Sequence, residues 1–262
     1  MARDPSLPPL PKIMVAPNGA RRTKADHPAL PLTVSETVDA ALACFEAGAD
    51  GLHAHVRDKT GAHVLDPVLY LDLLSEMNAA VPQMQVQITT EAVGKYSPRD
   101  QRQLVRDVVP QSVSISVAEM LSDGDLVRAS AFYGWARETG IAVQHILYSS
   151  DDLTRLSELI ASKAVPGTDH QILFVLGRYK DNQESAPSDL EPFLEELEKT
   201  RDSWAADWAV CAFGRRETDC LVEAVKRGGK ARIGFENGLW NRDGSLARDN
   251  ADRVRDLVSA LN

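Results

Sequence analysis

The sequence is poor in cysteine: Cys44, Cys211 and Cys220 are the only three among 262 residues, and no two of them form a CxxC pair. This odd number and wide spacing exclude a disulfide framework and a thiolate zinc site. Free thiols are typical of a reducing compartment, so we expect a cytoplasmic protein. Long apolar runs are also missing, because no stretch approaches the roughly 18 apolar residues of a membrane-spanning helix.

An excess of basic residues is absent as well. The sequence has 29 Lys and Arg against 38 Asp and Glu, a formal net charge of −9. Because binding to phosphate backbones requires a basic face, this balance excludes a general nucleic-acid partner. The N-terminus lacks the apolar core of a signal peptide, and its prolines predict an extended arm over residues 1–11. Hydrophobic residues make up 44% of the chain, enough for a folded core.

A repeated pattern fills the chain: a short apolar run, a polar turn and an amphipathic stretch. The apolar runs predict strands over residues 12–17, 51–57, 85–90, 112–116, 141–148, 171–177, 207–214 and 230–237. The amphipathic stretches predict helices over residues 34–47, 67–80, 98–108, 123–139, 151–162, 187–199, 217–227 and 248–261. The runs begin on average about 31 residues apart, which is the length of a βα unit.

Eight alternating units without a break in composition predict one (β/α)8 TIM barrel domain over residues 1–262. An open doubly wound sheet is the competing fold. It usually carries a glycine-rich phosphate loop after the first strand, whereas residues 18–22 read NGARR here. We therefore favour the barrel, in which reacting groups lie at the C-terminal ends of the strands.

Two histidines stand at the end of the second predicted strand. His53 and His55 are two residues apart, so both imidazoles point to the same face of a strand. Two adjacent buried imidazoles are costly without a partner, and a divalent metal is the usual one. Glu236 on the predicted strand 230–237 is the expected third ligand, and this set suits Zn²⁺. The alternative for Glu236 is a salt bridge to Arg57 or Arg232.

Polar side chains follow other strand ends. Arg21, Arg22 and Lys24 come after the first predicted strand, where they are candidates for holding an acidic substrate or a phosphate. Other candidates for binding a carboxylate are the hydroxyl groups of Thr89 and Thr90, which end the third predicted strand. Ser112, Ser114 and Ser116, which alternate along the fourth predicted strand, are further candidates. Strand propensity and local capping explain these hydroxyls equally well.

Four of these segments together resemble one family. APNGAR after the first strand, HAHVRD on the second, ITT on the third and RIGFEN on the eighth are similar to the β-keto acid cleavage enzymes. The similarity runs over the whole chain and includes FGRRETD after the seventh strand. The resemblance implies a zinc-dependent reaction in which a β-keto acid and acetyl-CoA become acetoacetate and a new CoA thioester. We also expect a homo-oligomer.

The resemblance assigns roles motif by motif. His53, His55 and Glu236 correspond to the zinc ligands, and Arg232 corresponds to the active-site arginine of the family. Two hydroxyl residues correspond to groups that hold the substrate carboxylate, namely Thr89 and Ser114.

Two positions depart from the family pattern. Asn237 stands where an aspartate of the family takes part in proton abstraction, and an amide cannot act as a general base. Arg21 stands where an acid pairs with the amino group of 3-keto-5-aminohexanoate. This reversal of charge predicts a substrate whose distal part is anionic or polar, such as a dicarboxylic β-keto acid.

Two other classes of function compete with this interpretation. Amidohydrolase-like metal hydrolases also use an HxH pair, with further histidines on the fifth and sixth strands, where this chain has His145 and His170. Their HxH pair lies on the first strand, however, and their acid on the eighth strand is an aspartate. The second alternative is a non-catalytic relative that binds metal and CoA, in which Asn237 marks lost catalysis.

Overall fold

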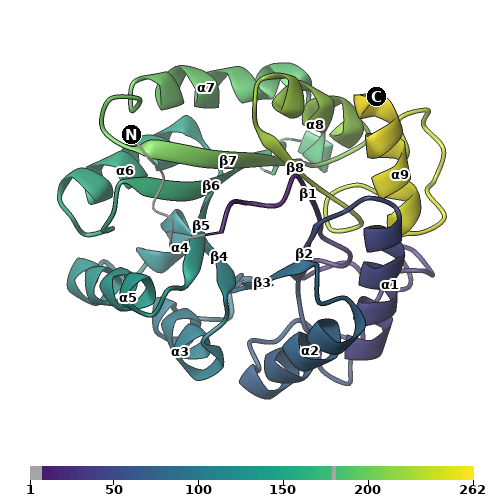
Figure 1. Cartoon of the computed structure of the whole chain (residues 1–262), viewed down its shortest axis with the longest axis horizontal. Helices are drawn as coiled ribbons and strands as arrows, with labels where there is room; N and C mark the ends of the chain where they lie inside the picture. Colours follow the sequence, from purple (N-terminus) through teal and green to yellow (C-terminus); the bar gives the residue numbers. More distant parts are fainter. Residues whose placement is uncertain (1–7, 179–180) are drawn as a thin grey trace.

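The computed structural model describes residues 8–178 and 181–262, and in this part eight parallel strands pair in sequence order to close a barrel (Figure 1). The strands are β1 (Ile13–Val15), β2 (Gly51–Ala54), β3 (Gln85–Thr89), β4 (Ser112–Ser116), β5 (Ala142–Leu147), β6 (Asp169–Leu176), β7 (Ala205–Ala212) and β8 (Lys230–Ile233). Because β1 pairs with both β2 and β8, the sheet has no free edge. The predicted TIM barrel is therefore confirmed.

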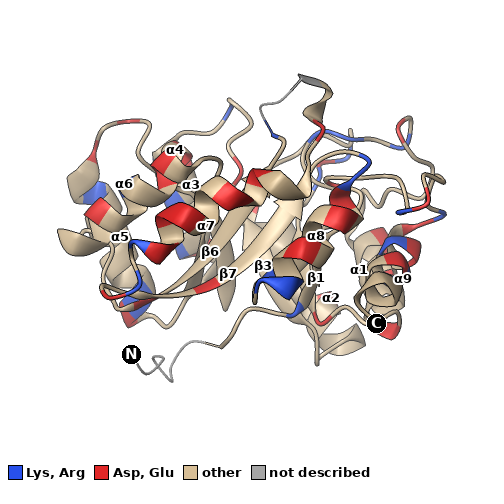
Figure 2. Ribbon diagram, turned by 90° about the horizontal axis from the view of Figure 1, so that it is seen from above, with Lys and Arg blue, Asp and Glu red and all other residues tan. Residues whose placement is uncertain are grey.

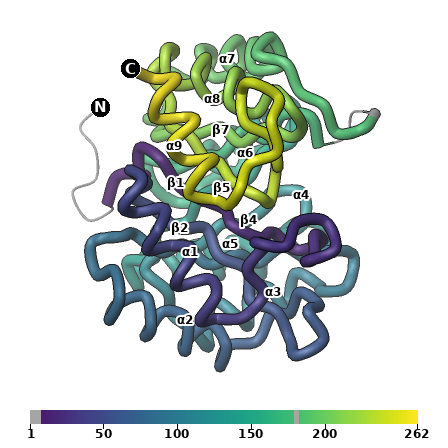
Figure 3. Tube along the Cα trace, turned by 90° about the vertical axis from the view of Figure 1, so that its right-hand side faces the viewer, coloured from purple at the N-terminus to yellow at the C-terminus, as the bar shows by residue number. Residues whose placement is uncertain are grey.

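Helices surround this barrel. They are α1 (Val34–Glu46), α2 (Pro67–Ala80), α3 (Pro98–Val108), α4 (Val117–Met120), α5 (Leu126–Glu138), α6 (Ser150–Ala161), α7 (Glu191–Glu198), α8 (Glu217–Lys226) and α9 (Asn250–Leu261), with 3₁₀ turns η1 (Asp181–Gln183) and η2 (Pro187–Leu190). α9 packs between α8 and α1 and so closes the helical ring (Figures 1 and 3). No helix in the described ranges is long and apolar enough to cross a membrane.

Local sequence explains most helix boundaries. Thr33 and Glu36 form a capping box at the start of α1, and prolines occupy the first position of α2 and α3. Two predicted helices begin three or four residues too early. The helix expected from residue 123 begins only at Leu126, because the side chain of Asp125 accepts the N–H of Arg128 and caps it there. The helix expected over 187–199 begins with the 3₁₀ turn η2.

Side chains alternate between the two faces of each strand. Val113 and Ile115 of β4 join the large core between barrel and helices, whereas Ser112 lies inside the barrel beside Gln87 of β3. A smaller apolar cluster fills the barrel interior: Leu10, Ile146, Leu173, Val175, Ala209, Cys211 and Phe213. The barrel is therefore a packed core with a site at one end and no channel through it.

The predicted N-terminal arm lies partly outside the described residues, which begin at Pro8. Residues 8–11 form neither helix nor strand and close the end of the barrel where the strands begin. There the N–H of Leu10 donates to Asp207 Oδ2 at 2.8 Å, and Lys230 Nζ donates to the carbonyl of Leu10 at 2.6 Å. Access for ligands is left at the opposite end, formed by the C-terminal strand ends and the βα loops, which we call the mouth.

Seven of the eight strands end earlier than predicted, and two of these ends bear on the site. β2 ends at Ala54, so His55 follows the strand, and β8 ends at Ile233, so Glu236 lies in a turn. The chain leaves β8 at Gly234, which has a φ of +142°, and a Cβ there would come within 2.4 Å of the carbonyl oxygen of Ala16. Only glycine fits this close approach of two backbones. Phe235 does not join the core between barrel and helices but packs in a separate cluster with Leu30, Leu239 and Ala247.

Candidate metal centre

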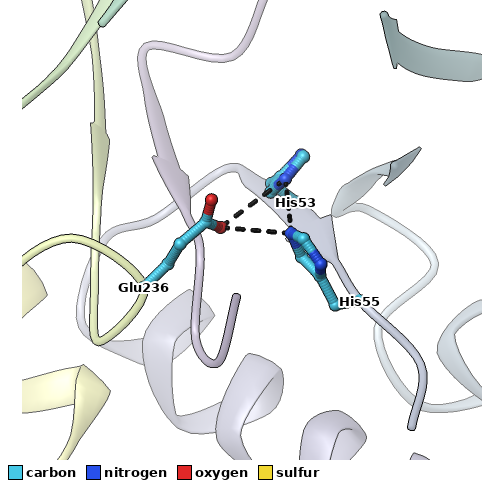
Figure 4. Close-up of side chains that lie close together, drawn as sticks. All are labelled: His53, His55 and Glu236. Atoms are coloured by element: carbon cyan, nitrogen blue, oxygen red, sulfur yellow. Dashed lines mark hydrogen bonds and ion pairs between the residues drawn. The ribbon is translucent and has the colours of Figure 1, made fainter. Parts of the chain in front are cut away.

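Three side chains meet at the mouth (Figure 4). His53 Nε2 and His55 Nε2 are 3.2 Å apart, and they lie 3.6 Å and 3.5 Å from the same oxygen, Oε2 of Glu236. Both histidines are buried, and Glu236 Oε2 is buried without a hydrogen-bond partner among the described residues. The three residues selected from the sequence are therefore brought together, although two of them lie just beyond their strands.

This triangle has the dimensions of a tetrahedral metal site. Ligand bonds of about 2.1 Å at tetrahedral angles place neighbouring ligand atoms about 3.4 Å apart. The observed separations of 3.2–3.6 Å match that value. Two imidazoles and one carboxylate also form the donor set of known zinc centres that keep a position open for a ligand. The residues present fit a divalent metal, with Glu236 Oε2 as the otherwise unpaired ligand atom.

A chain of amides fixes the ring of His53. Its Nδ1 lies 2.9 Å from Oε1 of Gln87, while Nε2 of Gln87 donates to Oε1 of Gln144 at 3.0 Å. Because Oε1 of Gln87 can only accept, the proton of His53 is on Nδ1, and Nε2 keeps its lone pair for a metal. Burial, together with the nearby charge of Arg232, holds the pKa of His53 well below its usual range. The ring is therefore neutral, as metal binding requires.

His55 has no such partner in the described structure. Its buried Nδ1 makes no hydrogen bond, and Oε2 of Glu91 lies 3.9 Å away. The ring of His63 lies 5.0 Å from that of His55, and its Nε2 is 3.0 Å from the backbone oxygen of Glu91. Burial lowers the pKa of His63 to about 3, so this neighbouring ring is neutral.

The turn after β8 and the loop after β1 hold Glu236 between them. The N–H of Glu236 donates to the carbonyl of Ala16 at 3.0 Å. Gly19, with a φ of +59°, lies directly against the side chain, and a Cβ there would come within 2.6 Å of Glu236 Cγ. This glycine therefore leaves the space that the carboxylate arm occupies.

A fully buried ion pair supports the same turn. Glu217 Oε1 accepts the N–H of Gly234 at 3.2 Å, and its Oε2 lies 2.9 Å from Arg253 Nη2. Burial raises the pKa of Glu217 to about 7, and the charge and hydrogen bond of Arg253 oppose this rise. The ion pair links α8 and α9 to the backbone that carries Glu236.

Two arginines clamp the loops around the site. Arg57 donates to the carbonyls of Gly19, Asn18 and Arg22. Arg22 in turn donates to the carbonyls of Phe235 and Asn237. The loop after β1 and the turn after β8 are therefore joined through guanidinium groups, which fixes the direction in which Glu236 enters the site.

Arg232 lies inside the barrel below this triangle. Its Nη2 is 3.3 Å from both Cys211 Sγ and Glu236 Oε1, while Nε and Nη1 are buried without a partner among the described residues. Burial opposes ionisation of Glu236, but Arg232 and the two imidazoles outweigh it and hold the pKa of this carboxyl well below its usual range. Glu236 is therefore ionised, and Arg232 keeps two donors for a ligand.

A small cavity of about 20 Å³ adjoins these groups. Besides His53, His55 and Glu236, its polar and aromatic lining includes Thr89, Glu91, Tyr148, Arg178, Phe213 and Arg232. The hydroxyl oxygen of Thr89 accepts the N–H of Glu91 at 3.1 Å. Its own proton is then available to a ligand.

The other sequence-selected residues lie away from this cavity lining. Ser114 is buried inside the barrel, and its hydroxyl has no partner among the described residues. Asn237 is fully buried in the turn after β8, and both polar atoms of its side chain lack a partner in the same ranges. Arg21 is exposed, whereas the adjacent Arg22 makes the loop contacts.

The two histidines that an amidohydrolase-like site would need lie elsewhere. The ring of His145 packs 5.4 Å from that of Tyr133 on the helix side of β5, and the ring of His170 packs 5.5 Å from that of Trp204. Neither joins the cluster of His53, His55 and Glu236. Burial lowers the pKa of His145 to about 3 and that of His170 to about 4, so both are neutral core residues.

The structure brings to the site several residues that were not predicted to lie there. Gln87 carries a signal, since it lies two residues before Thr89 and so shares its inward face on β3. Glu91 and Arg178 are charged residues two positions after the ends of β3 and β6, which in a barrel places them at the mouth. The contacts of Arg22 and Arg57 with loop carbonyls could not be predicted, because no periodic pattern in the sequence indicates them.

Fold and site together define a class: a TIM barrel with a candidate divalent-metal centre and a buried arginine at the C-terminal ends of its strands. Sequence comparison specifies the class further. A family model described as beta-keto acid cleavage enzyme matches residues 12–262, and the chain belongs to this family. The resemblance seen in the motifs is confirmed.

Characterised relatives carry related names. A 3,5-dioxohexanoate:acetyl-CoA acetone transferase of Paraburkholderia graminis is 24% identical over 95% of this chain and 89% of its own length. A 3-keto-5-aminohexanoate cleavage enzyme of Acetoanaerobium sticklandii is 23% identical, with 92% and 87% covered. A 3-oxoadipate:acetyl-CoA acetyltransferase of Cupriavidus necator is 25% identical, with 94% and 87% covered. These relatives differ in the keto acid that their names specify.

Solved structures share the fold. A ternary complex of ObcA with a C4-CoA adduct and oxalate has a TM-score of 0.68 and 16% identity. It matches 89% of this chain, which spans only 64% of the ObcA chain. A type I 3-dehydroquinate dehydratase from Clostridium difficile has a TM-score of 0.62 and 13% identity, with 96% and 91% covered. At such identities the likeness supports the barrel alone.

Proposed function

We propose that this protein is a zinc-dependent enzyme that condenses a β-keto acid with acetyl-CoA to give acetoacetate and a new acyl-CoA. The observation that carries the proposal is the triangle of His53, His55 and Glu236 beside the buried guanidinium of Arg232. Membership of the β-keto acid cleavage family and the acetyl-CoA-dependent names of two relatives agree with it.

The products define which bonds change. C2 of the β-keto acid loses a proton and bonds to the acetyl carbon of acetyl-CoA, whose bond to the CoA sulfur breaks. The freed CoA thiolate then bonds to C3 as the C2–C3 bond breaks. Negative charge develops on C2 and on the keto oxygen during this exchange. His53, His55 and Glu236 would hold a zinc ion, which would supply Lewis acidity for a carbonyl oxygen.

The chain supplies the remaining functions. Arg232 has two buried donors without a partner among the described residues, which suit the substrate carboxylate and the developing charge. We assign the hydroxyl of Thr89 to the same carboxylate, since it lines the cavity, and Ser114 to a supporting position deeper in the barrel. The amide of Asn237 takes no proton, so the C2 proton goes to another group at the mouth, which returns a proton to C2 when the C2–C3 bond has broken.

An anionic cosubstrate suits the mouth despite the overall negative charge. Figure 2 shows blue stretches of Lys and Arg in the loops above α8 and α9, while these helices themselves carry much red. Arg215 and Arg216, directly after β7, are exposed, and the Arg215 guanidinium lies 4.7 Å from the centre of the Trp240 ring. We assign these arginines to the phosphates of acetyl-CoA.

We further propose that copies of this one-domain chain associate. Leu42 of α1 and Val68 and Leu71 of α2 are large apolar side chains left exposed on neighbouring helices. Such apolar surface is commonly buried between subunits. Light scattering of the purified protein gives the subunit number, and a monomer at micromolar concentration would contradict this proposal.

The test of the proposed reaction is a coupled assay. The purified protein, with and without added Zn²⁺ or a chelator, is incubated with acetyl-CoA and a series of β-keto acids, and acetoacetate is measured. We expect acetoacetate and a new acyl-CoA in equal amounts, lost with the chelator and restored by Zn²⁺. Acetoacetate formation that is unaffected by complete metal removal would refute the metal dependence, and none from any β-keto acid would refute the reaction.

A further inference from the structure

An ion pair lies across the mouth cavity, and the metal triangle does not explain it. Arg178, two residues after β6, places Nη2 3.2 Å from Oε1 of Glu91, which follows β3 by two residues. Both side chains line the cavity beside His55 and Arg232. Their exposed fractions are 18% and 16%, so both charges are largely withdrawn from water.

Withdrawing the charges of Arg178 and Glu91 from water costs free energy, and a function of this ion pair would explain why the cost is accepted. The desolvation penalty of two partly buried ions offsets most of their attraction, so an ion pair of this kind is weak evidence for a role in stability. The guanidinium of Arg178 also lies 5.4 Å from the centre of the Phe213 ring, which lines the same cavity. Stacking on an aromatic face leaves the edge of a guanidinium open to in-plane acceptors.

Glu91, the acidic partner of the pair, has an alternative hydrogen-bond partner nearby in His55. The buried Nδ1 of His55 has no hydrogen-bond partner in the described ranges, and Oε2 of Glu91 is 3.9 Å from it. A shift of the carboxylate by about 1 Å would bring it to hydrogen-bond distance. Histidines that bind metal through Nε2 commonly donate Nδ1–H to a carboxylate, as His53 donates to Gln87 here.

We propose that Arg178 binds a second, distal carboxylate of the substrate, exchanging Glu91 for it, and that the released Glu91 accepts the Nδ1–H of His55. The substrate is then a dicarboxylic β-keto acid. Every charged group keeps a partner through this exchange, which avoids leaving a buried ion unpaired. This inference rests on the proposed function, because it names the substrate class of that site.

Size and charge support the exchange. A cavity of about 20 Å³ has room for about one water molecule, so a keto acid enters only when a lining side chain moves. Arg178 and Glu91 are the lining pair whose contact a ligand can replace with an equivalent one. The charges of Arg178 and Glu91 cancel, and so do those of Arg232 and Glu236. The two positive charges of a bound divalent metal would then remain, and they would balance the two negative charges of a dicarboxylate.

This assignment replaces Arg21, the arginine that the sequence suggested for the same task. Arg21 is exposed and lies outside the cavity lining, whereas Arg178 lies within it. Both are arginines of the mouth, so they form a matched pair for an experiment. The same substitution at each position separates a cavity contact from a general effect of surface charge.

The direct test measures binding without turnover. Calorimetry with zinc-loaded protein compares adipate with hexanoate, non-reacting acids of equal length that differ in the second carboxylate. We expect wild type to prefer adipate by roughly tenfold to a hundredfold, the effect of one charge-assisted contact. Arg178→Gln should abolish this preference with zinc content unchanged, while Arg21→Gln should retain it.

The role of Glu91 as a positioning residue has a separate readout. Glu91→Ala removes the competitor for Arg178, so adipate should bind more tightly than to wild type. It also removes the acceptor that receives Nδ1–H of His55, so kcat should fall while KM for a dicarboxylic β-keto acid does not rise. A rise in KM with unchanged kcat would show a simple contact with substrate and overturn this role.

The outcomes separate the two proposals. Equal binding of adipate and hexanoate by wild type, or an adipate preference that survives Arg178→Gln, overturns the inference whether or not the protein forms acetoacetate. A preference that follows Arg21 also overturns it. Absence of acetoacetate from 3-oxoadipate with acetyl-CoA, in a wild-type protein that shows the Arg178-dependent preference, refutes the proposed reaction and leaves the assignment of Arg178 intact.

Discussion

Gly19→Ala is the substitution that most selectively disturbs the proposed metal centre. The added methyl carbon would come within 2.6 Å of Cγ of Glu236, 3.1 Å of its Cβ and 3.3 Å of its Cα. Carbon atoms in contact normally lie about 3.5–4.0 Å apart, so the arm of Glu236 must move by about 1 Å. Metal–ligand distances tolerate only about 0.2 Å, and Oε2 therefore leaves the triangle with His53 and His55.

The cost to folding is much smaller than the effect on the metal. Gly19 has a φ of +59°, where an alanine costs about 1–2 kcal/mol. A domain with a stability of about 5–15 kcal/mol remains folded after that loss. Supporting contacts of metal ligands are worth roughly 10- to 100-fold in affinity, and we expect zinc binding to weaken by at least this factor.

Gly124 offers the matched control. It has a φ of +71°, and a Cβ there would meet nothing within 4 Å, so Gly124→Ala carries the backbone strain without the contact. Thermal unfolding without metal should show similar losses for both variants, and zinc titration should show weakened binding for Gly19→Ala alone. Equal zinc affinity in the two variants would refute the claim that Gly19 makes room for a metal ligand.

Three further expectations follow from the same structure. Arg22→Ala frees the carbonyls of the turn that carries Glu236 and should weaken zinc binding in a titration, whereas Arg21→Ala should not. Asn237→Asp adds a titratable carboxylate at the mouth and should raise turnover or shift the pH optimum, and an unchanged pH–rate profile with zinc bound would exclude a role in proton transfer. Burial lowers the pKa of His145 to about 3, so folding keeps a neutral ring that the unfolded chain protonates below about 6.5. Its contribution to stability is therefore complete above pH 6.5 and lost as the pH falls toward 3. Between these pH values, the free energy of unfolding should depend less on pH in His145→Phe than in wild type, which denaturant titrations at several pH values would measure.

Periodicity predicted the parts of the molecule that repeat. Strand and helix positions follow from alternation and from caps such as Thr33 and Pro67, which act through local backbone hydrogen bonds and dihedral angles. The spacing of His53 and His55 also sufficed, because His53 lies on β2 and His55 directly follows its last residue, so both rings still reach the same site.

The loops could not be predicted in this way. Glu236 was expected on a strand, yet it reaches the site from a turn that depends on the close approach of Gly234 to the backbone of Ala16. Arg21 and Arg22 are adjacent in an irregular loop, and only Arg22 turns inward. It does so because it donates to the carbonyls of residues 235 and 237, which are 213 and 215 positions away in the sequence. The pair of Glu91 and Arg178 joins residues 87 positions apart, which no local pattern encodes.

Zinc stoichiometry in ligand variants tests the central claim most directly. Metal analysis of dialysed protein should find one zinc per chain in wild type and in His63→Gln, whose ring lies 5.0 Å from that of His55 outside the triangle. His53→Ala, His55→Ala and Glu236→Ala should each lose the metal and remain folded by circular dichroism. A wild type that binds no divalent metal, or a double histidine variant that keeps stoichiometric zinc, would contradict the assignment of this site.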